Sequence, residues 1–460
     1  MRAHPAGPLH ADLLPEQGPG LPPAHPAALA AHVWPLGTRR EPSGVVSLHG
    51  RPLTDLADEH GTPAFFMDEA DFRARARAFR SAFDGCVVYY AAKAFLSRAV
   101  ARWVHEEGLF IDVCSGGELR VALDAGFPVE NIALHGNNKS LAELEMAVQN
   151  QVGLVVVDSF DEIDALATVA AAHGRVQPVL LRVRVGVEAH THEFIATAHE
   201  DVKFGFSRSA GDALAAVRAT LDRSSLQLRG LHSHIGSQIF DTAGFEVAAA
   251  RMVELLVQVR DELGVELPEL DLGGGLGIAY VDADDPQPLD QLATRLLDIV
   301  ARECLRAGLA VPQVAVEPGR ALVGPAMMTV YRVGTVKNVD GIRTYVSVDG
   351  GMSDNIRTAL YDADYTVTLA NRAPSEPLML TRVVGKHCES GDVVVRDAWL
   401  PSDIRPGDLL AVAATGAYCR SMASNYNMVE RPPVVVVDEE GSRVIVRRES
   451  MDDLLACDLG

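Results

Sequence analysis

Residues Val87 to Leu96 read Val-Val-Tyr-Tyr-Ala-Ala-Lys-Ala-Phe-Leu. This stretch contains a predicted strand and the lysine around which the predicted fold and site are arranged. Cys86 to Ala91 is a short apolar run with β-branched and aromatic residues, which predicts a buried strand. Lys93 follows the carboxyl end of that strand. The chain has five lysines against 36 arginines. A snorkelling or ion-paired lysine is the commoner explanation for one such residue. A rare lysine at this place indicates amine chemistry instead, because an amine can lose its proton in an apolar site and attack a carbonyl.

Short apolar runs alternate with amphipathic segments up to about residue 323. The runs are Cys86 to Ala91, Leu109 to Val113, Ile132 to Leu134, Leu154 to Val157, Val179 to Val185, Leu228 to His232, Leu270 to Leu272 and Val314 to Val316. The amphipathic segments include 69–83, 117–125, 140–149, 160–172, 210–221, 243–263 and 289–307. Eight strands, each coupled to a helix, predict a closed parallel (β/α)8 barrel of the TIM type, with a doubly wound sheet as the alternative.

A barrel places its chemistry at the carboxyl ends of the strands. The residues at those ends are Lys93, Asp112, His135, Asp158, Arg184, His232, His234, the run from Gly273 to Gly277, Glu317 and Arg320. Nearly every predicted strand is therefore followed by a polar residue or a glycine.

The remaining segments predict three further parts. Residues 1–40 are rich in Pro, Ala, Gly and His and indicate an extended or flexible N-terminal arm. Residues 41–66 contain a hairpin pattern and are expected to join a β domain. The barrel is expected over 67–325. Residues 326–460 contain short strands with turn signals and no long helix, which predicts a C-terminal all-β domain, a barrel or sandwich.

Composition restricts the class of function. The 41 basic and 62 acidic residues give a net charge of −21, and no basic run exceeds a pair, which argues against nucleic acid or an anionic membrane as a partner. No stretch of 18 apolar residues and no basic-apolar leader is present. The six cysteines have no CxxC spacing. We expect a cytoplasmic protein.

Four motifs carry the chemistry. The glycine run 273–277 could wrap backbone N–H groups around a phosphate, but it lacks the nucleotide-binding register. Glu317-Pro-Gly-Arg320 puts a carboxylate near the mouth of the barrel, although a lone buried Glu is usually ion-paired. His232 and His234 share one strand face. No motif nearby supplies the further ligands that a zinc site needs, so we expect these rings to stack on or orient a ligand rather than bind a metal. His190 and His192, in a predicted loop, are a weaker candidate for a metal-binding pair. Cys388 lies beside Glu389, and a thiol can donate a proton when its pKa is tuned.

The order of these motifs, followed by Cys388-Glu-Ser-Gly-Asp392, resembles the alanine-racemase-like, fold-type III pyridoxal-phosphate (PLP) enzymes, and within them the diaminopimelate decarboxylase family. The resemblance runs from about Gly44 to the C-terminus. It implies a PLP cofactor and a small amino-acid substrate, meso-2,6-diaminopimelate, which would be decarboxylated to L-lysine and CO2. It also implies a homodimer in which each active site lies between one subunit's barrel and the other's β domain.

The resemblance further implies a role for each matching residue. Lys93 would bind the cofactor covalently, His234 would stack on its ring and Glu317 would pair with the ring nitrogen, with Asp112 beside them. The other cofactor-binding residues would be Ser237, Gly274, Gly275, Pro318, Gly319, Arg320 and Tyr418. The substrate-binding residues would be Arg320, Arg357, Tyr361, Glu389 and Tyr418. Cys388 would be the second catalytic residue, reaching in from the partner subunit.

Two alternatives remain open. A decarboxylase for ornithine, arginine or another basic amino acid would need an acidic residue for the distal ammonium, and relatives of that kind usually place one where this chain has Arg357. A non-catalytic PLP-binding regulatory homologue could keep Lys93 and the phosphate turn while losing the proton donor. Cys388, Arg357 and Tyr361 are all present, which favours a decarboxylase of a carboxylate-bearing substrate.

Overall fold

The computed structural model describes residues 23, 25–186, 202–240, 242–340, 342–375 and 377–460. His190, His192 and most of the predicted N-terminal arm lie outside these residues. In the described part of the chain, no helix is both long and apolar enough to cross a membrane.

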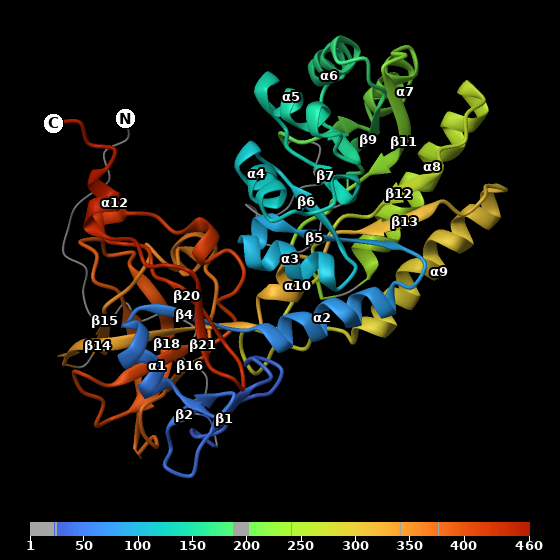
Figure 1. The fold of residues 1–460 in the computed structure, drawn as a ribbon. Helices are drawn as coiled ribbons and strands as arrows, with labels where there is room; N and C mark the ends of the chain where they lie inside the picture. Colours follow the sequence, from blue (N-terminus) through green and yellow to red (C-terminus); the bar gives the residue numbers. More distant parts are fainter. Residues whose placement is uncertain (1–22, 24, 187–201, 241, 341, 376) are drawn as a thin grey trace, which may run out of the picture.

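Eight parallel strands close into a barrel (Figure 1). They are β5 (Val87–Ala91), β6 (Phe110–Val113), β7 (Ile132–Leu134), β8 (Leu154–Val157), β9 (Gln177–Arg184), β11 (Leu226–His232), β12 (Glu269–Asp271) and β13 (Gln313–Val316). Each strand pairs with the next in sequence, and β13 pairs with β5 to complete the circle. The short strand β10 (Phe206–Ser207) adds to β9. The predicted (β/α)8 barrel is confirmed, and the doubly wound alternative is wrong.

Helices between the strands surround the barrel. They are α2 (Glu69–Ala82), α3 (Arg98–Glu106), α4 (Gly116–Asp124), α5 (Leu141–Asn150), α6 (Phe160–Ala172), α7 (Asp212–Leu221), α8 (Ala243–Leu263) and α9 (Leu289–Ala307). Helices α3 to α6 each begin directly after a serine whose hydroxyl accepts a hydrogen bond from a backbone N–H of the first turn. Serine is a strong N-cap because it satisfies an otherwise unpaired donor. These caps fix where each strand exit turns into a helix.

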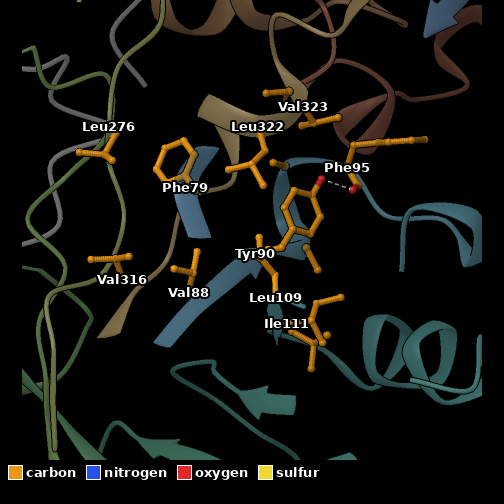
Figure 2. Packing of buried hydrophobic residues seen from close by; sticks show 14 of the residues in the cluster. Phe79, Val88, Tyr90, Phe95, Leu109, Ile111, Leu276, Val316, Leu322 and Val323 are labelled. Carbon is orange, nitrogen blue, oxygen red and sulfur yellow. Dashed lines mark hydrogen bonds between the residues drawn. The ribbon is translucent and has the colours of Figure 1, made fainter. Parts of the chain in front are cut away.

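Strand β5 shows how alternation holds the site residues in place. Val88 and Tyr90 face the helices; Figure 2 shows Tyr90 packed close to Leu109 and Ile111, and its hydroxyl donates to the backbone oxygen of Phe95 at 2.6 Å. Tyr89 points the other way and packs inside the barrel with Ala133, Leu154, Val156, Leu180 and Ala315. Both faces of β5 are therefore packed, and the 3-10 turn η1 (Ala92–Ala94) that carries Lys93 begins from a rigid strand end.

A second sheet lies beside the barrel (Figure 1). It contains β14 (Met327–Val339), β15 (Arg343–Val348), β16 (Val367–Leu369), β17 (Leu378–Val384), β18 (Val393–Pro401), β19 (Leu409–Val412), β20 (Val434–Val437) and β21 (Ser442–Val446). Strand β4 (Ala64–Asp68) comes before the barrel in sequence but lies between β14 and β20. The helices of this part are short: α1 (Leu53–His60), α11 (Arg357–Tyr361) and α12 (Met451–Leu455). A further short helix, α10 (Arg320–Val323), comes after the last barrel strand. The predicted all-β domain is confirmed, and the boundaries given above remain a prediction.

The end of the predicted N-terminal arm is folded. Strands β1 (Thr38–Arg40), β2 (Val46–Leu48) and β3 (Arg51–Pro52) form a small antiparallel sheet. Trp34 is buried in a cluster with side chains of β2 and of the second sheet. These last residues of the predicted extended or flexible arm are packed, because a large indole finds an apolar contact surface there, and the bounds of the arm remain a prediction.

Candidate active site

Lys93 lies among anionic groups at the carboxyl end of the barrel. Desolvation lowers the pKa of Lys93, but electrostatic interactions with Tyr418, Asp112 and Glu317 outweigh it, so the pKa lies above its ordinary value. The sequence suggested an apolar site that favours a neutral amine. The neighbouring strand ends supply carboxyl groups beside the amine, and these favour its charged form. The ammonium must lose a proton before it can attack a carbonyl.

Glu317, which follows β13, is held by two histidines from other strands. His135 Nε2 lies 2.8 Å from Glu317 Oε1, and His232 Nε2 lies 3.3 Å from Oε2. Burial raises the pKa of Glu317, but the two imidazoles lower it more, and the net pKa lies well below the ordinary value. Burial lowers the pKa of His135 to about 4. Glu317 is therefore an ionised carboxylate, 4% exposed, at the mouth of the barrel.

Two further carboxyl groups border this centre. Burial, followed by the charge of Glu317, raises the pKa of Asp112 and of Asp271 well above the ordinary value. Asp271 accepts a hydrogen bond from the backbone of Gly273 at 2.8 Å. Glu317 thus keeps its charge, while the two aspartates are biased towards protonation.

The glycine run lines a cradle that side chains would fill. A Cβ on Gly274 would lie 2.1 Å from the backbone oxygen of Glu317, and one on Gly275 would lie 2.3 Å from that of Gly236. Gly275 also has a φ of +110°, which other residues rarely adopt. Gly274 donates its N–H to His234 Nδ1 at 3.1 Å. Only glycine fits at these two positions, so backbone N–H groups can approach a ligand closely.

The Glu-Pro-Gly-Arg turn closes the other side of the cradle. The N–H of Ala91 donates to the oxygen of Pro318 at 3.1 Å, and a Cβ on Gly319 would lie 2.8 Å from that of Ala91. Arg320 donates to Ser237 Oγ at 2.9 Å. The turn is therefore packed directly against the strand that leads to Lys93.

His234 and Tyr418 approach the same place from different parts of the chain. Burial, followed by the charges of Lys93 and Arg182, lowers the pKa of His234 well below the ordinary value. Its imidazole is therefore neutral and suited to stacking. Tyr418 donates its backbone N–H to the oxygen of Ala94 at 2.9 Å, beside Lys93. The sequence predictions for both positions thus lead to one region of the molecule.

The guanidinium groups of Arg320 and Arg357 are linked through two tyrosine side chains. Arg320 donates to the hydroxyl of Tyr280 at 2.5 Å, and Arg357 donates to the hydroxyl of Tyr365 at 2.5 Å. The Arg357 guanidinium also lies 4.6 Å from the ring centre of Tyr280. Neither tyrosine was among the residues predicted from the sequence. Tyr280 lies three residues beyond the glycine run, and that proximity was the one available signal.

Cys388 and Glu389 form no hydrogen bond or ion pair with these residues in the described part of the chain. Both are exposed on the loop after β17, and the N–H of Cys388 donates to Asn427 Oδ1 at 3.2 Å. The Glu389 side chain accepts a hydrogen bond from the N–H of Gly391 at 3.3 Å. Their polar contacts in the described chain are all within the β domain. Tyr361 ends α11, one turn beyond Arg357.

The residues of the barrel mouth fit PLP. Lys93 would offer an amine to its aldehyde carbon, Glu317 an ionised carboxylate to its ring nitrogen and His234 a neutral ring to its face. The glycine cradle would let its phosphate approach the backbone at Gly275, whereas the N–H of Gly274 is donated to His234. The same His135, His232 and Glu317 have ligand atoms within 4.8 Å of one another and could also bind a metal ion. The expected absence of a metal therefore remains a prediction.

Similarity to known proteins supports a PLP-binding site in this barrel. The pyridoxal-binding domain of the pyridoxal-dependent decarboxylases matches residues 69–324. Diaminopimelate decarboxylase of Mycobacterium tuberculosis is 58% identical over 440 residues, which cover 94% of this chain and 98% of the relative. That of Mycobacterium leprae is 55% identical over 473 residues and covers both chains completely.

A solved structure extends the likeness to the fold. The diaminopimelate decarboxylase of M. jannaschii in complex with L-lysine superposes with a TM-score of 0.85 at 30% identity, over 92% of this chain and 98% of the other. Fold, cofactor-binding geometry and sequence identity lead to the same assignment. This chain belongs to the diaminopimelate decarboxylase family of PLP-dependent carboxy-lyases, which convert meso-2,6-diaminopimelate to L-lysine.

Proposed function

We propose that this protein decarboxylates meso-2,6-diaminopimelate to L-lysine and CO2, the last step of lysine biosynthesis, with the predicted residues in the roles that follow. The observation that carries the substrate assignment is the pair of buried guanidiniums, Arg320 and Arg357, beside the cofactor cradle. In the described chain neither forms an ion pair with a carboxylate, although they are only 6% and 5% exposed. Buried cations without a counter-ion are costly, so a carboxylate ligand is the natural complement.

Lys93, Glu317 and His234 would hold the reacting end. PLP supplies an electron sink for the pair of electrons left when CO2 departs. Lys93 would bind the cofactor covalently and release it to the substrate amine. Glu317, kept ionised by two imidazoles, would hold a proton on the ring nitrogen, and His234 would fix the ring plane. Asp112, whose pKa is raised by burial and by Glu317, would border the amine of Lys93 as a further cofactor contact.

The remaining residues would bind the phosphate and the substrate. Ser237, Gly274, Gly275, Pro318, Gly319, Arg320 and Tyr418 are the proposed phosphate and cofactor contacts. Arg320, Arg357, Tyr361, Glu389 and Tyr418 are the proposed substrate contacts. Cys388 would deliver the proton that replaces the lost carboxylate on the substrate carbon.

A second copy of the chain would complete the site. The exposure of Cys388 and Glu389, and their contacts within the β domain, support a homodimer in which this loop enters the partner's barrel mouth. The proposal includes a cytoplasmic location, which the six free cysteines support.

A decarboxylase of a basic amino acid is the rival function. Its substrates carry a distal ammonium, which two buried guanidiniums would repel by several kcal/mol at low effective dielectric. The assay that separates the two supplies meso-diaminopimelate, ornithine, arginine and lysine in turn to the PLP-loaded protein and measures CO2. We expect release from diaminopimelate at least a hundredfold faster than from the others. Faster release from ornithine or arginine would reject the assignment.

A further inference from the structure

Arg320 and Arg357 are buried, yet tyrosines rather than carboxylates hold them. The Nε atoms of both guanidiniums have no hydrogen-bond partner within the described chain. A guanidinium that was ion-paired with a carboxylate of the protein would have its charge neutralised and would be unavailable to bind the substrate. One hydrogen-bonded to a neutral hydroxyl keeps its charge and its other N–H groups available. The tyrosine hydroxyls therefore orient the two guanidinium groups and leave their charge available for a ligand.

Tyr280 contacts both arginines. Its hydroxyl accepts a hydrogen bond from Arg320 at 2.5 Å, and its ring centre lies 4.6 Å from the Arg357 guanidinium carbon. A ring face attracts a cation, and this attraction is strongest where water is excluded. One side chain therefore restrains both guanidiniums by two different physical interactions.

Tyr365 supports the second arginine. Its hydroxyl accepts a hydrogen bond from Arg357 at 2.5 Å, and its ring meets that of Tyr280 edge-on, with centres 5.2 Å apart and planes at 78°. Edge-to-face packing is a preferred arrangement of aromatic rings. The two tyrosines therefore form one unit with a guanidinium at each hydroxyl.

The backbone of Tyr280 joins the two halves of the molecule. Its N–H donates to Asp284 Oδ2 at 2.8 Å on the barrel loop. Its carbonyl oxygen accepts hydrogen bonds from Thr366, at 3.1 Å from the backbone N–H and 2.8 Å from the hydroxyl. Arg320 belongs to the barrel and Arg357 to the β domain. Tyr280 thus sets the distance between two cations that are carried by different domains.

We propose that Tyr280 and Tyr365 are positioning residues that hold Arg320 and Arg357 at the separation needed to bind the distal carboxylate of the substrate. This inference rests on the proposed function. It adds that selectivity for the distal carboxylate depends on two tyrosines that need not touch the substrate, because each acts through an arginine.

The test compares two ligands of the PLP-loaded protein by titration calorimetry. L-Lysine retains the carboxylate that the reaction leaves in place, whereas 1,5-diaminopentane has the same carbon chain and amines without it. We expect Tyr280→Phe, which loses the hydroxyl but keeps the ring, to weaken L-lysine binding about tenfold, as for one hydrogen bond to a charged group. Binding of 1,5-diaminopentane should change less than twofold. The KM for diaminopimelate should rise about tenfold, and kcat should change less than KM.

Three more variants sharpen the result. Tyr280→Leu removes hydroxyl and ring together and should weaken L-lysine further than Tyr280→Phe. Tyr365→Phe should repeat the tenfold loss, and it carries the test if a Tyr280 variant fails to fold. Tyr345→Phe, in β15 and half-buried, is the matched control and should leave both ligands unchanged.

Equal weakening of both ligands in Tyr280→Phe and Tyr365→Phe, or no weakening of L-lysine in either, would overturn the positioning role. A wild-type protein that binds L-lysine no better than 1,5-diaminopentane would reject the proposed substrate and the positioning role together. The wild-type measurement therefore separates failure of the function from failure of the inference.

Discussion

His135 Nε2 lies 2.8 Å from Glu317 Oε1, and burial lowers the pKa of His135 from 6.5 to about 4. A histidine that directly follows the third barrel strand thus approaches a carboxylate that follows the eighth. The neutral imidazole can orient the carboxylate by a hydrogen bond without removing its charge.

This relationship predicts a pH dependence of stability. The unfolded chain binds the His135 proton near pH 6.5 and the folded chain only near pH 4. The contribution to the free energy of unfolding is therefore complete above pH 6.5 and is lost as the pH falls towards 4, by on the order of 3 kcal/mol. We expect His135→Gln to flatten this decline in denaturant titrations. His173→Gln, at an exposed position, is the control. An equally steep decline in His135→Gln would contradict the assigned pKa.

Glu317→Gln tests the charge opposite the ring nitrogen. The amide keeps the shape but not the charge, so we expect kcat to fall by on the order of a hundredfold or more. Cofactor affinity, measured by fluorescence titration with PLP, should change little because the phosphate contacts remain. Loss of PLP binding with normal kcat at saturating cofactor would be the opposite pattern and would refute the role.

Metal removal tests whether His135, His232 and Glu317 bind a metal ion or serve the cofactor site alone. We predict that dialysis against a chelator leaves diaminopimelate decarboxylation unchanged, because these side chains serve one another and the cofactor. An activity that disappears on chelation and returns with one divalent cation would identify a metal centre instead.

Mixing inactive variants tests the shared site. Lys93→Ala and Cys388→Ala should each be nearly inactive. After subunit exchange about half of the dimers carry one mutation on each chain, and each of these has one intact site of two, so about a quarter of wild-type activity should return. If both residues act within one subunit, every site keeps a defect, and the mixture stays inactive even when mass spectrometry verifies exchange.

Strand and helix positions could be predicted because each barrel element has its own local pattern. The apolar run before Lys93 and the serine caps of α3 to α6 are examples. Most of the site residues could also be predicted, because they follow the carboxyl ends of the strands, which lie at the same side of the barrel.

Contacts between distant segments could not be predicted in the same way. No spacing links His135 to Glu317 or Tyr280 to Arg357, because these pairs meet only after the barrel closes and the β domain packs against it. The raised pKa of Lys93 depends on charges from three other segments, and the burial of Trp34 depends on the second sheet.

The covalent link between Lys93 and the cofactor is the feature on which the proposed function depends most directly. Borohydride reduction of the PLP-loaded protein fixes that link, and peptide mapping then locates it. We expect a single labelled peptide that contains Lys93, and no label in Lys93→Ala. Label on Lys139, Lys203, Lys337 or Lys386 instead, or a protein that takes up no PLP, would contradict the proposed function.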